Sequence, residues 1–191
     1  AYADFLADHG VSLWLFYAGG GAFRPAGHPG ASACRTRGFP EPAVSEADLN
    51  GVFARCARRG MEVVVTSGLF GWDGLADIVV NERPDLQAEG VPHPGMMCLS
   101  RPETLEIAEA YFLEMAERFP AATGVGMEVA CEMGHCRCAR CAGRAGEIEL
   151  GFLDRFAVRL RGKRPDARIV WFAGYRSHAD DPAYYRRLAA L

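Results

Sequence analysis

The chain has 191 residues, half of them hydrophobic, which is enough to bury a core and predicts a single domain over residues 1–191. Its formal net charge is −3 and no basic face stands out, so we expect no nucleic-acid partner. No apolar stretch is long enough to cross a bilayer, so we expect no membrane span either.

The first residues and the cysteine count bear on the compartment. The opening AYADFLADHG carries acidic side chains where a secretory signal would be basic, so it does not read as a signal peptide. Seven cysteines are an odd number, which argues against a complete set of internal disulfides. Both features favour a cytoplasmic protein. The chain lacks an initiator Met, and we expect a processed protein or a piece of a longer one.

Amphipathic helical patterns alternate with apolar, β-branched runs along the chain. Two helix starts carry capping-box residues, Ser45 with Asp48 and Ser100 with Glu103. This alternation predicts a parallel sheet with helical crossovers. The expected helices span about 2–10, 45–60, 100–120, 147–161 and 181–191, and the expected strands lie near 11–17, 61–67, 124–131 and 168–174, with a short one near 95–99.

Two long irregular segments, 18–44 and 81–99, follow the first two expected strands. Loops of that length inside a domain are usually functional. Because they follow strands, they belong at the carboxyl edge of the sheet, where α/β proteins place their sites.

The run GVGMEVACE, residues 124–132, distinguishes two α/β folds. Alternation puts Gly126, Glu128 and Glu132 on one face, which is therefore small and acidic. A doubly wound sheet is apolar on both faces, whereas a barrel lumen accepts such a face near its mouth. A closed barrel needs about 250 residues, so we expect an incomplete TIM-type (βα) barrel, its N-terminal part. An open doubly wound parallel sheet is the alternative.

The order of motifs resembles the N-terminal half of glycosidase TIM barrels of the β-N-acetylhexosaminidase kind (glycoside hydrolase family 20). It is also similar to less characterised bacterial barrels related to them and to the α-glucuronidases. The resemblance covers roughly residues 60–145. The matching pieces are RPDL at 83–86, CLS at 98–100, ERFP at 117–120 and GVGMEVACE at 124–132, followed by a C-x-C-x-x-C motif that resembles one in the uncharacterised relatives.

The resemblance implies that Glu132, at the end of that strand, is the general acid of a glycoside hydrolase. Hexosaminidases end the strand with Asp-Glu, whereas this chain has Cys131-Glu132, so the assisting Asp is missing. The resemblance therefore implies a general acid at Glu132 but does not imply attack by the substrate's own acetamido group. Cleavage needs two carboxyl groups, and Glu128 lies about 13 Å from Glu132 along a strand. We therefore expect the second carboxylate on another strand, in the remainder of the parent barrel.

Aromatic and polar side chains near the expected strand ends suit sugar binding, because sugar rings stack on aromatic faces. Each such aromatic alone is equally typical of a core position, and each polar residue of a plain surface. The candidate substrate-binding residues are Tyr17, Trp72, Glu128, Trp171, Tyr175 and Arg176.

Three cysteines, Cys136, Cys138 and Cys141, lie close together next to His135. Thiolates at such spacing can surround one tetrahedral ion, and zinc is the usual choice. His135 is our candidate for the fourth ligand, with Cys131 and Cys34 as alternatives. A disulfide plus free thiols is the competing interpretation. If zinc binds, a structural role is expected.

The sequence thus favours a carbohydrate-active barrel acting on O-glycosidic bonds, with a carbohydrate substrate. Two alternatives remain. One is a non-catalytic glycan-binding relative that has lost the carboxyl pair. The other is a zinc-binding module whose cysteine cluster is itself the active site.

Overall fold

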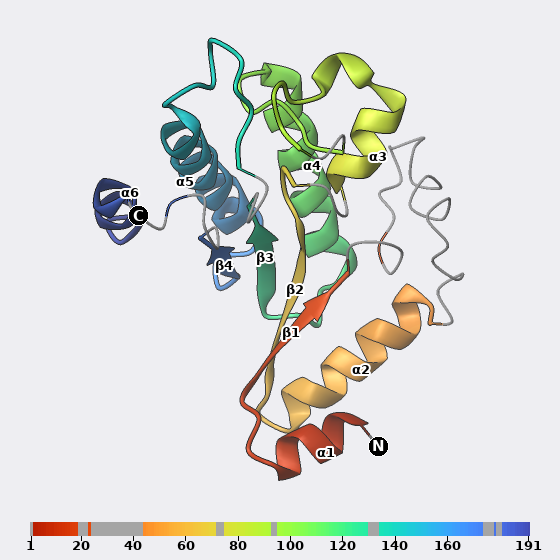
Figure 1. Cartoon of the computed structure of the whole chain (residues 1–191). Helices are drawn as coiled ribbons and strands as arrows, with labels where there is room; N and C mark the ends of the chain where they lie inside the picture. The colour runs from red at the N-terminus through yellow and green to blue at the C-terminus, as the bar shows by residue number, and fades with distance from the viewer. Residues whose placement is uncertain are drawn as a thin grey trace.

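The computed structural model describes residues 2–18, 23, 44–71, 75–92, 95–129, 134–173, 178 and 181–191. Their centre is a four-stranded parallel sheet in which the strands follow chain order, β1-β2-β3-β4 (Figure 1). The strands are β1 (Leu13–Tyr17), β2 (Glu62–Gly68), β3 (Gly124–Glu128) and β4 (Arg168–Phe172). The four long strands expected from the sequence are confirmed.

The short strand expected near 95–99 is wrong. Met97 makes only an isolated antiparallel bridge with Gln87. Backbone hydrogen bonds from Ala88 N–H to Met96 O and from Cys98 N–H to Leu86 O join the two ends of this loop to each other. The segment therefore satisfies its backbone locally and adds no strand to the sheet.

The described helices are α1 (Tyr2–Asp8), α2 (Glu46–Arg58), α3 (Leu75–Glu82), the 3₁₀ helix η2 (Pro84–Leu86), α4 (Pro102–Arg118), α5 (Ala145–Lys163) and α6 (Pro182–Leu188). The pattern did not predict α3, since LADIVVNE is rich in β-branched residues of low helix propensity. Burial of Leu75, Ala76 and Val79 outweighs that preference. No helix within these described ranges is long and apolar enough to cross a membrane.

The helix caps agree with the sequence at α2 and differ at α4. Ser45 and Asp48 form the expected reciprocal capping box. At α4 the expected box is wrong, because the helix begins at Pro102 with Arg101 as N-cap and makes no side-chain cap bond. The hydroxyl of Ser100 lies instead 3.6 Å from Cys138 Sγ. Ser100 thus belongs to the cysteine cluster described below.

One face of the sheet packs against the helices. Trp14 and Phe16 of β1 contact Phe53 of α2, with ring centroids 6.1 and 5.2 Å away. Further along, the hydroxyl of Ser67 in β2 lies 3.0 Å from that of Tyr111 in α4. The buried layer between sheet and helices is the main apolar core of the described chain.

The opposite face carries Leu13, Leu15 and Tyr17, which are 42%, 39% and 39% exposed. Gly126 lies near its centre, and a Cβ at this position would come within 2.5 Å of a Thr66 methyl carbon. The described helices therefore cover one face and not both, as expected for part of a barrel wall, and the doubly wound alternative does not hold.

Candidate metal centre and the carboxyl edge of the sheet

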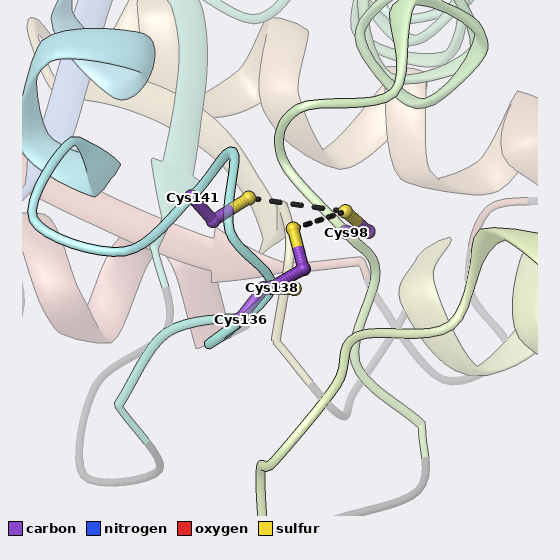
Figure 2. A group of neighbouring side chains, drawn as sticks. All are labelled: Cys98, Cys136, Cys138 and Cys141. Carbon is purple, nitrogen blue, oxygen red and sulfur yellow. Dashed lines mark hydrogen bonds between the residues drawn. The ribbon is translucent and has the colours of Figure 1, made fainter.

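Four cysteines from two loops converge at one place. Cys98 lies in the loop that leads into α4, whereas Cys136, Cys138 and Cys141 lie in the loop between β3 and α5. Figure 2 shows Cys98 facing the other loop across a short gap. All four sulfurs lie within 4.8 Å of one another.

The sulfur spacing fits a tetrahedral ion better than a disulfide. Cys98 Sγ lies 3.8 Å from Cys138 Sγ and 3.8 Å from Cys141 Sγ. A disulfide would require a sulfur–sulfur distance of about 2.05 Å. A zinc ion bound to four thiolates at about 2.3 Å gives tetrahedron edges of about 3.8 Å. All four thiols of the cluster are free, so the competing disulfide interpretation finds no support among them.

The surroundings of the cysteine thiols shift their pKa values in opposite directions. Burial raises the pKa of Cys136 to about 12 and also raises that of Cys141. A hydrogen bond from the Ser100 hydroxyl lowers the pKa of Cys138 to about 6. Without an ion, Cys138 therefore becomes a thiolate at lower pH than Cys136 and Cys141, and an incoming cation would displace the protons of those two thiols.

Backbone groups fix the two loops to each other. The Glu89 N–H donates to Cys136 Sγ at 3.3 Å, and the Arg137 N–H donates to Glu89 O at 2.8 Å. Gly90, at φ +66°, lies so close that a Cβ there would be 3.1 Å from Arg137 Cβ. The cluster is therefore built on an ordered junction of two loops.

This donor set fits zinc in a structural role. Four thiolates occupy all four positions of a tetrahedral ion, which leaves no position for a substrate or a water. Cys98, Cys136 and Cys141 are buried, and Cys138 is half-buried. The alternative in which the cysteine cluster is itself a catalytic centre requires an open position that this arrangement does not offer.

The sequence identified three of the four cysteines. It offered His135 as the fourth ligand, but His135 lies in a separate group with Glu149 and His178. The other two candidates, Cys131 and Cys34, lie outside the described residues. Cys98 lies in the CLS motif and far from the other three cysteines in the chain, so spacing does not predict it as a ligand. Its position between a long loop and a strong helix start was the signal that could have identified it.

Two predicted substrate contacts lie together at the carboxyl edge of the uncovered face. Tyr17 ends β1 and Glu128 ends β3, with Gly68 of β2 paired to Glu128. The Gly68 N–H donates to the Tyr17 hydroxyl at 3.2 Å, which fixes the ring at this edge. Both side chains remain partly accessible.

Trp171 lies elsewhere. It pairs with Met127, on the helix-covered face, and its indole N–H donates to the Tyr184 hydroxyl of α6 at 2.7 Å. Trp171 thus lies on the side opposite to that of Tyr17 and Glu128. The remaining predicted site residues lie outside the described residues: Glu132, Trp72, Tyr175 and Arg176.

The fold built from these elements is that of glycosidase TIM barrels. Similar solved structures include a β-N-acetylhexosaminidase from Bacteroides fragilis, at TM-score 0.62 and 17% identity, and a second β-N-acetylhexosaminidase, at 0.57 and 18%. A maltogenic α-amylase from Thermotoga neapolitana is similar at TM-score 0.56 and 15% identity. The likeness to hexosaminidase barrels that the motifs indicated is confirmed for the fold.

The chain covers only part of these enzymes. The alignments include 89%, 90% and 97% of this chain but 37%, 42% and 41% of the respective structures. The chain matches no protein-family model and no curated protein sequence. The described strands therefore correspond to an incomplete barrel.

Proposed function

We propose that this chain is part of a glycoside hydrolase that cleaves O-glycosidic bonds of a carbohydrate substrate, with Glu132 as the general acid. The main support is the parallel sheet, which has helices on one face, a partly open opposite face and the fold of glycosidase barrels. In parallel α/β barrels, active sites are built at the carboxyl ends of the strands.

Position along the chain supports the role of Glu132. It follows β3, which ends at Glu128, and precedes the cysteine loop. A general acid must stay protonated until it donates, and apolar surroundings favour that form. Met133, the next residue in the chain, is apolar. The second carboxyl group has to lie about 5 to 10 Å from Glu132. In this proposal, a strand of the remaining barrel supplies it.

The direct test is Glu132→Gln in the full-length protein, assayed on aryl glycosides and on natural oligosaccharides. We expect a loss of about 10²- to 10⁴-fold in rate on natural substrates, because the leaving oxygen is no longer protonated. The loss should be smaller for aryl glycosides, since an activated leaving group needs less protonation. The ratio of the two losses is the diagnostic measurement.

Two control variants separate acid catalysis from binding. Glu128→Gln, at the end of the same strand, should raise KM similarly for both substrate types. Glu103→Gln, exposed at the start of α4, should change neither rate nor KM. Equal rates for Glu132→Gln and the parent would remove Glu132 from the mechanism. A full-length protein that binds glycans but cleaves none would favour the glycan-binding alternative.

We further propose that Cys98, Cys136, Cys138 and Cys141 bind one structural zinc ion. The support is the 3.8 Å spacing of Cys98 Sγ from two of the other sulfurs, which fits a zinc–thiolate tetrahedron. The ion would hold the loop after β3 against the loop before α4. Cys136 follows Glu132 by four residues in the connection between β3 and α5, so the ion would also limit the motion of the proposed acid.

Cys98→Ser tests this proposal, with Cys56→Ser as the matched control. Cys56 is a free, buried cysteine of α2 that takes no part in the cluster. Cys98→Ser should weaken zinc binding at this site by more than about 100-fold, because even outer partners of a ligand contribute 10- to 100-fold. Cys56→Ser should retain the affinity of the parent. Unchanged zinc affinity in Cys98→Ser, measured by competition with a chelator, would contradict the proposal.

A further inference from the structure

A second group of potential ligands lies near the cysteine cluster, and one cleft is lined by members of both groups. His135 lies in the loop after β3, Glu149 lies in α5, and His178 lies just before α6. One donor atom from each residue lies within 4.8 Å of the other two. Glu149 is fully buried and His178 is 5% exposed. Three separate elements thus place two imidazoles and a carboxylate together.

The carboxylate of Glu149 is only half satisfied. Its Oε2 lies 2.7 Å from His178 Nε2 and accepts from the Tyr184 hydroxyl at 3.4 Å. Within the described part of the chain, Glu149 Oε1 and both ring nitrogens of His135 are buried without a hydrogen-bond partner. His135 Nδ1 is 3.4 Å from Glu149 Oε1. Unpaired buried polar groups are costly, so an arrangement of this kind calls for an additional partner.

The walls of the group are rigidly packed. The His178 ring stacks on Tyr184 with centroids 3.8 Å apart, and Trp171 donates to the Tyr184 hydroxyl. Gly146 of α5 makes room for this stack, since a Cβ there would come within 2.9 Å of Tyr184 and 3.3 Å of His178. The ligand geometry is therefore held by aromatic packing as well as by the polar contacts.

We propose that His135, Glu149 and His178 bind a divalent transition-metal ion, separate from the cysteine site. Two imidazole nitrogens and one carboxylate oxygen are a donor set that Zn²⁺ accepts readily. The bound ion would neutralise the buried carboxylate of Glu149. It would also give a partner to polar atoms of Glu149 and His135 that otherwise have no hydrogen bond. Binding would replace the hydrogen bond between His178 and Glu149, and the proton of that bond would leave to solvent.

Three protein ligands leave a fourth position of the ion free. A cleft of about 390 Å³ opens beside the group and is lined by His135, His178, Gly146 and Asp181, among others. A water molecule or a small oxygen or nitrogen donor from solvent can fill that position. The site therefore differs from the closed four-thiolate site. This proposal does not depend on the glycosidase assignment.

The test is the zinc content of the folded chain after equilibration with Zn²⁺ and dialysis, compared with that of two variants. We expect two equivalents in the parent and one in Glu149→Gln, which keeps the side-chain volume but lowers the ligand's charge. Glu147→Gln is the matched control, because Glu147 is an exposed neighbour on the same helix that pairs with Arg144. It should keep both equivalents.

His135→Gln is a second variant that tests the same site in case Glu149→Gln does not fold. His135 has no hydrogen bond in the described part of the chain, so its replacement should leave the fold intact, as circular dichroism would show. It should also bind one equivalent. Equal zinc content in the parent and in folded His135→Gln would overturn the proposal and leave a metal-free hydrogen-bonded cluster.

Discussion

The two faces of the sheet come from the same four strands and are packed very differently. On the helix-covered face, Val63, Val65 and Met127 are at most 1% exposed. On the other face, Leu15 and Tyr17 of the edge strand β1 are each 39% exposed, whereas Val64 and Thr66 of the inner strand β2 are at most 3% exposed. A doubly wound protein covers both faces with helices, whereas a barrel covers only its outer face. The difference between the faces therefore identifies the barrel wall more directly than the strand order does.

The largest effect should come from the covered face. Phe53 is fully buried in α2 and contacts Trp14, Phe16 and Phe119. Phe53→Ala should lower the free energy of unfolding by about 3–5 kcal/mol, because it removes apolar contacts and leaves a cavity. Urea denaturation measures the change. Val158→Ala, at a 68% exposed position on α5, is the control and should stay within about 0.5 kcal/mol.

A much smaller effect should come from the uncovered face. Leu15→Ala removes a partly exposed side chain and should cost about 1 kcal/mol or less in this chain. The same denaturation measurement applies. If Leu15→Ala cost as much as Phe53→Ala, the uncovered face would have to be buried in solution, for example by self-association. A concentration-dependent midpoint would then distinguish that case.

Much of the fold could be predicted from the sequence, because local patterns determine it. The four long strands, the capping box at Ser45 and the cap at Asp181 all follow from residues close together in the chain. The α3 helix did not, because its β-branched residues favour a strand locally and only burial of its apolar side chains makes it helical. The cap at Ser100 also failed, since its hydroxyl has an alternative partner in Cys138.

The candidate site was less accessible from the sequence. Spacing brings Cys136, Cys138 and Cys141 together, but Cys98 reaches them only after the loop before α4 meets the loop after β3. Glu149 gave no signal at all, because a glutamate in an amphipathic helix is usually exposed. Its burial depends on the packing of α6 and His178 against α5, which no local pattern encodes.

The order of cysteines along the chain has a consequence for biosynthesis. Cys98 leaves the ribosome before α4 and β3, and the other three cysteines emerge only after β3. The four-sulfur cluster can therefore close only when β3 has been made and the loop before α4 has met the loop after β3. Binding of the proposed ion would then follow the first three strands and could precede β4, which is made after Cys141. A nascent chain that stalls before Cys136 would lack three of the four ligands.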